Sequence, residues 1–262
     1  MPYTANNGTR IYWEETGAGD PVLLIMGLGY SHDMWHRTRP ALSQRYRTIA
    51  FDNRGVGQSD VPAGPYTMAQ MAADAAAVLD AAQVDRAHVF GISMGGMIAQ
   101  EFALTYPARV RSLILACTAC GGRNAIAAAP NVLQVVMARA TMTPEEGAQA
   151  IVPFVYDRAT PRERIEEDLA IRRRTYPTAA GYLGQVQAIM AWTSLDRLPN
   201  IQAPTLILHG ESDELVPPEN ARILEKHIRG SRLVMLPHAS HIFTTDQPEA
   251  SHREILRFLS QT

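Results

Sequence analysis

Short apolar segments alternate with helical patterns along most of this chain. Residues 22–26 and 87–92 are apolar on both faces, which is typical of strands in the middle of a parallel sheet. Because parallel strands need crossover connections, this alternation predicts an α/β fold, with helices on both faces of a mostly parallel sheet. Further strands are expected at 46–51, 110–117, 205–209 and 231–236, and helices at 35–45, 68–82, 94–105, 218–227 and 248–260.

The first two predicted strands form a hairpin. Residues 3–6 and 9–16 flank the dipeptide Asn7-Gly8, which suits a tight type I′ turn. The sheet is therefore expected to begin with an antiparallel pair.

The alternation is interrupted once, between residues 119 and 198, where helical stretches follow one another without a convincing strand. We expect a four-helix cap here, inserted between strands 6 and 7, with 1–118 and 199–262 forming the core domain. The first three helices would each start with a proline, which suits a first helical turn. The helices are expected at 130–141, 144–156, 161–176 and 179–192.

Composition narrows the class of protein. The chain has 262 residues, of which 46% are hydrophobic and 19% charged, so it can bury a sizeable core and does not resemble a disordered protein. A net charge of −2 gives no attraction to nucleic acid or anionic membranes. No apolar run approaches the roughly 18 residues of a membrane span, and the start lacks the regions of a signal peptide. We expect a cytoplasmic protein that acts on a small molecule; its oligomeric state is not indicated.

Cys117 and Cys120 form the only C-x-x-C pair. A redox pair would be expected to open a helix, whereas Cys117 closes a predicted strand and Gly121-Gly122 follow. A zinc site would need further ligands at suitable spacing. We therefore expect no redox site, no metal and no cofactor.

The segment Gly91-Ile92-Ser93-Met94-Gly95 matches the pattern G-x-S-x-G. It follows a predicted strand and opens a predicted helix, which is the setting of a nucleophile elbow. Glycines at 91 and 95 would remove collisions with the adjacent strand and helix. The helix N-terminus also offers free N–H groups beside the hydroxyl, where an oxyanion can be held. Ser93 is therefore the candidate nucleophile.

A serine nucleophile needs a base, and the base needs an acid that orients it. Asp213 follows the strand at 205–209, and His241 follows the strand at 231–236. The carboxyl ends of parallel strands meet at one sheet edge, so both side chains are expected near Ser93.

Other residues compete for these two roles. Glu211 and Glu214 flank Asp213 closely, and His238 is the main alternative to His241. His252 lies within the last predicted helix, where we expect it to be exposed.

Together these segments resemble the α/β-hydrolase superfamily over nearly the whole chain. Residues 52–60 (DNRGVGQSD) are similar to its D-x-R-G-x-G-x-S loop, and Gly27-Leu28-Gly29 to its oxyanion loop. Two positions depart from the family pattern. Met26 stands where His is usual, and Ser240 precedes the candidate base where many members have Gly.

The resemblance implies roles for individual residues. Ser93 would be the nucleophile, Asp213 the acid and His241 the base. The backbone N–H groups of Leu28 and Met94 would form the oxyanion hole.

The implied activity is that of a serine hydrolase acting on carboxylic esters or small lactones through an acyl-enzyme. Among capped members, the chain is most similar to 3-oxoadipate enol-lactonases and small carboxylesterases. A C–C bond hydrolase or a cofactor-free perhydrolase would use the same triad, and a ligand receptor could keep a vestigial site. A dinucleotide-binding dehydrogenase would need a third glycine where His32 stands.

Three further expectations concern residues around the site. Asp52 and Arg54 should fix the loop after the fourth strand. Arg172, Arg173 and Arg174 should fan out over a solvated helix face, because consecutive helical residues are about 100° apart. Apolar cap side chains should enclose a cavity above Ser93 that accepts short-to-medium acyl groups, and no cap arginine can be placed in it from sequence.

Overall fold

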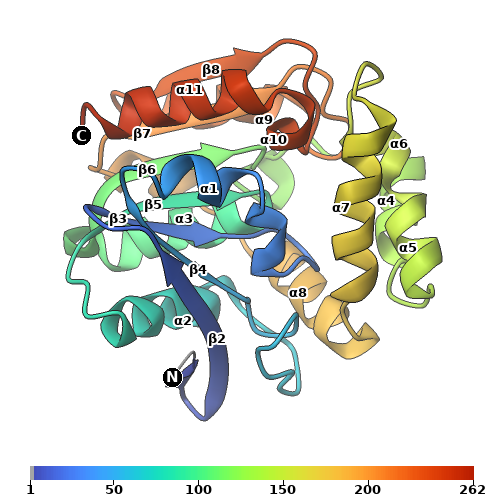
Figure 1. Ribbon diagram of the computed structural model, residues 1–262, viewed down its shortest axis with the longest axis horizontal. Coiled ribbons are helices and arrows are strands. Elements are labelled where there is room, and N and C mark those ends of the chain that lie inside the picture. The colour runs from blue at the N-terminus through green and yellow to red at the C-terminus, as the bar shows by residue number, and fades with distance from the viewer. Residues whose placement is uncertain (1–2) are drawn as a thin grey trace.

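The computed structural model describes residues 3–262 and has a single eight-stranded sheet at its centre (Figure 1). The spatial order of the strands is β1-β2-β4-β3-β5-β6-β7-β8. From β4 onward along this order every neighbouring pair is parallel, whereas β1, β2 and β4 pair antiparallel. The predicted α/β class is thus confirmed. The strands are β1 (Tyr3–Asn6), β2 (Thr9–Thr16), β3 (Pro21–Ile25), β4 (Arg47–Phe51), β5 (Ala87–Ile92), β6 (Val110–Ala116), β7 (Thr205–Gly210) and β8 (Arg232–Leu236).

The predicted hairpin is present at the start of the sheet. Asn7 and Gly8 connect β1 to β2 with φ angles of 48° and 80°. Both angles are positive, as a type I′ turn requires.

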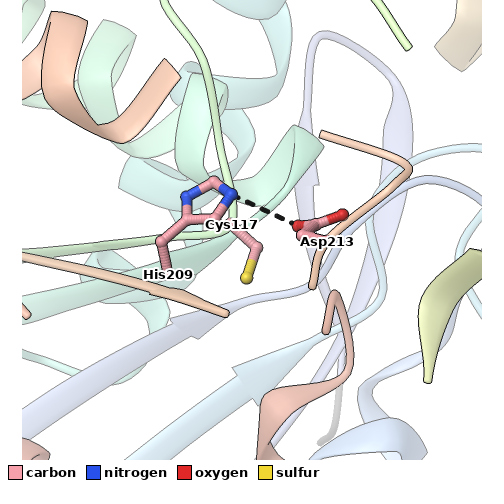
Figure 2. A group of neighbouring side chains, drawn as sticks. All are labelled: Cys117, His209 and Asp213. Carbon is pink, nitrogen blue, oxygen red and sulfur yellow. Dashed lines mark ion pairs between the residues drawn. The ribbon is translucent and has the colours of Figure 1, made fainter. Parts of the chain in front are cut away.

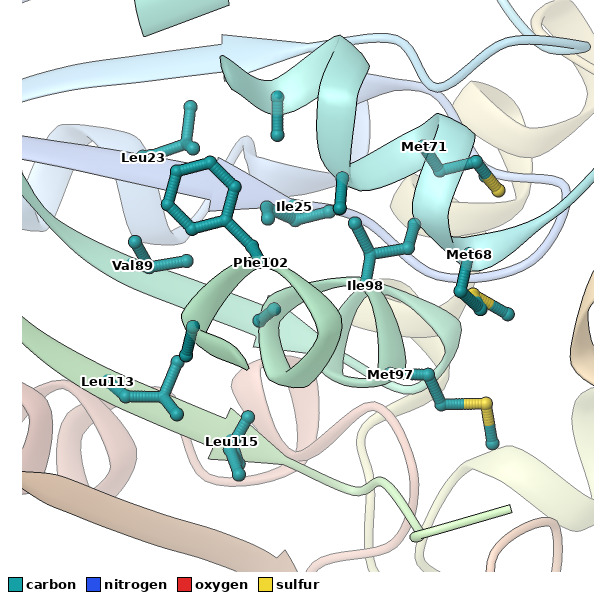
Figure 3. Close-up of a cluster of buried hydrophobic side chains, with 14 of the residues drawn as sticks. Leu23, Ile25, Met68, Met71, Val89, Met97, Ile98, Phe102, Leu113 and Leu115 are labelled. Atoms are coloured by element: carbon teal, nitrogen blue, oxygen red, sulfur yellow. The ribbon is translucent and has the colours of Figure 1, made fainter. Parts of the chain in front are cut away.

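Helices cover both faces of the sheet. On one face, α2 (Met68–Ala81) and α3 (Met94–Thr105) pack on the central strands, and Figure 3 shows Ile98 and Phe102 of α3 above Leu23 and Val89. The helix α9 (Glu219–His227) packs on the same face as α3. The other face is covered by α1 (Thr38–Leu42) and α11 (Pro248–Leu259). Each face of the sheet therefore has its own apolar core.

The predicted helix at 35–45 is shorter than expected. A 3-10 turn, His32–Trp35, precedes the single-turn helix α1. Pro40 has no amide hydrogen and fits only the first turn of a helix, so α1 cannot begin much earlier.

Between β6 and β7 the chain forms five helices instead of four. The stretch predicted as one helix at 144–156 is divided, because Pro153 cannot continue a helix and starts a new one. Figure 1 shows α4 to α7 standing together beside the end of the sheet. The helices are α4 (Pro130–Ala138), α5 (Pro144–Ala150), α6 (Val152–Val155), α7 (Arg162–Arg174) and α8 (Ala179–Ala191). A further short helix, α10 (Phe243–Asp246), follows β8.

None of the helices within residues 3–262 has the length and apolar character needed to cross a membrane.

Candidate active site

Ser93 occupies the sharp turn between β5 and α3. Its φ and ψ angles are 58° and −123°, a conformation that residues with side chains rarely adopt. A Cβ on Gly91 would collide with the carbonyl oxygen of Gly95, and a Cβ on Gly95 with that of Ile25. The glycines are therefore needed for the steric reason inferred from the sequence.

The loop that carries Leu28 lies directly against Ser93. A Cβ on Gly27 would come within 3.1 Å of the Cβ of Ser93. The backbone N–H groups of Leu28 and Met94 have no hydrogen-bond acceptor within residues 3–262. Two backbone donors beside the serine are thus free to receive an oxyanion.

Contacts from two other segments hold this loop in place. Asn53 Nδ2 donates a hydrogen bond to the carbonyl oxygen of Met26 (2.9 Å). The amide of Gly29 donates to Gln185 Oε1 (2.8 Å), while Gln185 Nε2 donates to the carbonyl of Arg54 (2.8 Å). Gln185 belongs to α8, and it could not be identified from the sequence because a helical pattern does not show which polar residue faces the core.

Asp213 and His241 form a buried pair at the ends of β7 and β8. His241 Nδ1 lies 2.8 Å from Asp213 Oδ2, and Asp213 Oδ1 accepts the amides of Leu215 (2.9 Å) and Val216 (2.8 Å). Burial opposes ionisation, but the charges and hydrogen bonds of His241 and His209 hold the pKa of Asp213 well below its ordinary value. The aspartate is therefore a fixed anion that engages one nitrogen of His241.

The competing residues do not share this arrangement. His238 is exposed, and so are Glu211 and Glu214. His252 is half-buried, with Nε2 3.3 Å from Thr38 Oγ1, so the expectation that it is exposed was wrong. It lies on the face of α11 that packs against α1.

His209 and Cys117 lie next to Asp213 (Figure 2). His209 Nε2 is 2.8 Å from the carbonyl of Val216 and 3.3 Å from Asp213 Oδ2. Burial raises the pKa of the Cys117 thiol well above its ordinary value, whereas a metal ligand would be a thiolate. Both oxygens of Asp213 already face donors, so these contacts suit the orientation of a carboxylate better than the binding of a metal ion.

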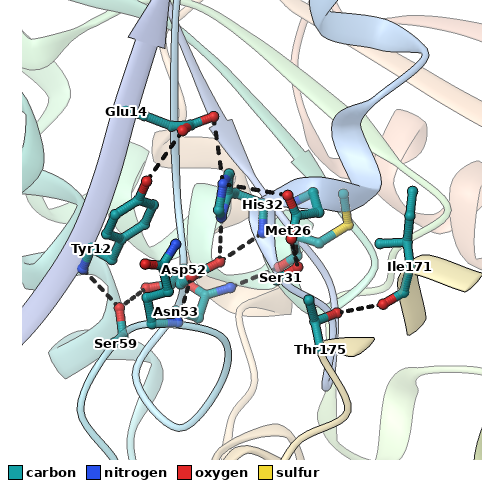
Figure 4. Close-up of polar contacts among 12 residues, drawn as sticks. Tyr12, Glu14, Met26, Ser31, His32, Asp52, Asn53, Ser59, Ile171 and Thr175 are labelled. Carbon is teal, nitrogen blue, oxygen red and sulfur yellow. Dashed lines mark hydrogen bonds and ion pairs between the residues drawn. The ribbon is translucent and has the colours of Figure 1, made fainter. Parts of the chain in front are cut away.

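Asp52 and Arg54 have the structural role expected of them. Asp52 Oδ1 accepts hydrogen bonds from the amide of His32 and faces its Nδ1, both at 2.7 Å, and Oδ2 accepts the amide of Gln58 (Figure 4). Arg54 forms two hydrogen bonds of 2.7 Å to Asp74. Asp52 thus fixes the loop after β4 to the segment after β3, and Arg54 fixes the same loop to α2.

A cavity of about 540 Å³ lies over Ser93 and is also lined by His241. Its wall is mainly apolar, and the helices between β6 and β7 contribute Val136, Ile189 and Met190. Arg139, which directly follows α4, also lines it. An arginine from the stretch between β6 and β7 thus contributes to this wall, which the sequence could not indicate.

The three consecutive arginines at the end of α7 do fan out, but they do not all face solvent. Arg172 is only 1% exposed, which corrects the expectation of a solvated face. Arg173 pairs with Glu145, and the side chain of Arg174 is 68% exposed. Because successive helical residues turn by about 100°, one of the three had to point inward once α7 packed on the core.

A short segment after α6 is tied to both loops that carry Asp213 and His241. Asp157 accepts the hydroxyl of Ser212 (2.6 Å), next to Asp213. Asp246 accepts the hydroxyl of Thr160 (2.6 Å) and the amide of Ser240 (2.7 Å), next to His241. Burial raises the pKa of Asp246 to about 6.

Comparison with known proteins agrees with this geometry. A family model described as alpha/beta hydrolase fold matches residues 20–248, so the chain belongs to the α/β hydrolase family and is a hydrolase of that superfamily. A relative from Azorhizobium caulinodans named "Putative carbamate hydrolase RutD" is 32% identical over 100% of this chain and 99% of its own length. The enol-lactonase from Burkholderia xenovorans LB400 is similar in structure, with a TM-score of 0.88 and 30% identity over 99% of this chain and 100% of that one. An esterase from Exiguobacterium antarcticum has a TM-score of 0.89 and 26% identity, covering 98% of each chain.

Proposed function

We propose that this protein is a serine hydrolase that cleaves carboxylic esters or small lactones through an acyl-enzyme. Ser93 Oγ attacks the carbonyl carbon while His241 takes its proton, and the N–H groups of Leu28 and Met94 stabilise the oxyanion. His241 then protonates the leaving oxygen, which leaves the acyl group on Ser93. Water, deprotonated by His241, releases the acid, and Asp213 holds the imidazole in the required tautomer.

The observation that carries this proposal is the shared cavity. Ser93, in its strained turn, and His241, held by Asp213, both line the same mainly apolar space. An apolar wall excludes water and strengthens the interaction of backbone donors with a developing oxyanion. The enol-lactonase and the esterase reported above are named for cleavage of acyl–oxygen bonds, which supports the same reaction here.

We further propose that residues 119–198 act as a cap on a core formed by 1–118 and 199–262. The cavity volume of about 540 Å³ suits a compact acyl group. Activity should therefore decline beyond roughly eight acyl carbons.

A panel of p-nitrophenyl butyrate, octanoate and palmitate, together with small lactones, tests the proposal. The butyrate ester should be hydrolysed faster than the palmitate ester. Equal or better rates on palmitate would contradict the enclosed cavity. Absence of hydrolysis of every ester and lactone would contradict the reaction itself and would favour a C–C bond hydrolase, a perhydrolase or a ligand receptor with the same site.

A further inference from the structure

The cavity over Ser93 is mainly apolar, but the charged groups in its wall are all of one kind. The charged side chains among its lining residues are those of Arg123 and Arg139, and no carboxylate is among them. Arg123 is exposed, whereas Arg139 is only 3% exposed. One of the two arginines that line the cavity is thus buried.

Arg139 lacks an acidic partner. Its Nε donates to the carbonyl of Gly147 (3.0 Å), but its Nη2 has no hydrogen-bond partner in the described part of the chain, and no carboxylate there lies within 4.0 Å. Its guanidinium carbon lies 5.4 to 5.8 Å from the ring centroids of three tyrosines. These are Tyr30, Tyr176 and Tyr182.

The tyrosines stabilise the cation without neutralising it. The hydroxyls of Tyr176 and Tyr182 donate to backbone carbonyls, so these side chains face Arg139 with their rings. Burial opposes the charge, but these aromatic neighbours hold the pKa of Arg139 above its ordinary value. Arg139 therefore stays charged inside the wall of the cavity.

A second buried arginine adds to the positive potential. Arg172 lies with its guanidinium carbon 4.7 Å from the centroid of Tyr30, the ring that Arg139 also faces. None of the three guanidinium nitrogens of Arg172 has a hydrogen-bond partner within residues 3–262. Asp168 lies one turn earlier on α7. Burial opposes its ionisation, but hydrogen bonds from His36 and Thr245 and the charge of Arg172 hold the pKa of Asp168 below its ordinary value. Its carboxylate is engaged by His36, Tyr156 and Thr245. Of these two buried arginines, Arg139 is the one whose side chain lines the cavity over Ser93.

A buried charge without a partner is costly, so buried arginines in proteins are normally paired with an anion. At the wall of a substrate cavity, the missing anion can be supplied by the substrate. Guanidinium groups bind carboxylates with charge-assisted hydrogen bonds, which are the strong ones.

We propose that Arg139 determines specificity by binding a free carboxylate of the substrate. The preferred substrates are then compact esters or lactones that carry a second, uncleaved carboxylate. This inference rests on the proposed function, because it concerns the same cavity and the same acyl transfer.

The test compares monoethyl with diethyl adipate, and monoethyl with diethyl suberate, by the release of ethanol. The wild-type kcat/KM should be about tenfold or more higher for the half-ester than for the diester, as expected for charged hydrogen bonds. Arg139→Met should bring this ratio close to one, and Arg139→Lys should restore part of it. Arg174→Met, at an exposed position on α7, should keep the wild-type ratio.

Three outcomes would overturn the inference. The first is a wild type that cleaves the diester as well as the half-ester. The second is an unchanged ratio in Arg139→Met, and the third is loss of the ratio in Arg123→Met instead. If Arg139→Met does not fold, the wild type is tested instead. Adipate and adipamide are compared as inhibitors of its hydrolysis of p-nitrophenyl butyrate, and only adipate should inhibit.

Failure of the proposed function gives a different result. Neither ester would then be cleaved. Calorimetry with the Ser93→Ala protein can still measure whether adipate and adipamide bind. Binding of adipate but not of adipamide would support the anion site, and equal or absent binding of both would contradict it.

Discussion

The imidazole of His241 and the carboxylate of Asp213 are joined through Nδ1 and Oδ2 at 2.8 Å, and both side chains are buried. Within residues 3–262, Asp213 contacts the rings of His241 and His209 and the amides of Leu215 and Val216. So many donors can be arranged only around an ionised carboxylate. An ionised Asp213 favours the tautomer of His241 that carries its proton on Nδ1, as the proposed mechanism requires.

Asp213→Asn should lower kcat by several orders of magnitude, because an amide cannot hold the imidazole in the required tautomer. Steady-state kinetics on p-nitrophenyl butyrate measure this effect. Glu214→Gln, at an exposed neighbouring position, should retain wild-type kinetics. Similar losses in both variants would mean that Asp213 is not the orienting acid.

His241→Ala should be nearly as damaging as removal of the serine hydroxyl, since the proton of Ser93 then has no acceptor. His238→Ala should be mild because His238 is exposed and outside the cavity. The same ester assay compares the two. An inactive His238→Ala with an active His241→Ala would reverse the assignment of the base.

Gln185→Ala should lower kcat by roughly tenfold to a hundredfold with a smaller change in KM, because the loop that carries the Leu28 amide loses its contact with α8. Gln187→Ala is the matched control, since Gln187 is exposed on the same helix. Thermal melting separates this effect from unfolding. A change confined to KM would contradict the positioning of the oxyanion loop.

Asp246 should make stability depend on pH. Its pKa is raised to about 6 when folded, against an ordinary value of 3.8, because burial disfavours its charge. Its contribution to folding is thus fully present below pH 3.8 and is lost as pH rises toward 6. Asp246→Asn stays neutral, so its unfolding free energy relative to wild type should rise between pH 4 and 6, by up to about 3 kcal/mol.

Urea denaturation at several pH values measures this difference. An unfolding free energy that differs between the two proteins by the same amount at every pH would show that Asp246 does not titrate in this range.

The sequence predicts the bounds of the parallel strands well, and with them the positions of residues that directly follow a strand. Each parallel strand lies within one residue of its predicted bounds, because continuous apolar runs mark buried strands. The carboxyl ends of neighbouring strands then bring Asp213 and His241 to the same edge as Ser93. Topology thus brings these two loops together, and their conformations then set the 2.8 Å contact between His241 and Asp213.

The positions of cap side chains could not be predicted in the same way. Arg139 and Arg172 are buried because of how α4 and α7 are rotated against the core, and rotation depends on tertiary packing that a helical pattern does not specify. The contacts of Gln185 with Gly29 and Arg54 could not be predicted for the same reason. The prediction of a single helix at 144–156 was wrong for a different reason, because it did not take into account that Pro153 cannot continue a helix.

Covalent labelling of Ser93 tests the central claim most directly. A p-nitrophenyl phosphonate should transfer one phosphonyl group per chain, with loss of ester hydrolysis in step with labelling, and mass spectrometry should locate the group on Ser93. The Ser93→Ala protein should neither be labelled nor hydrolyse esters beyond a small residue. Stoichiometric labelling at another residue, or substantial hydrolysis by Ser93→Ala, would contradict the account.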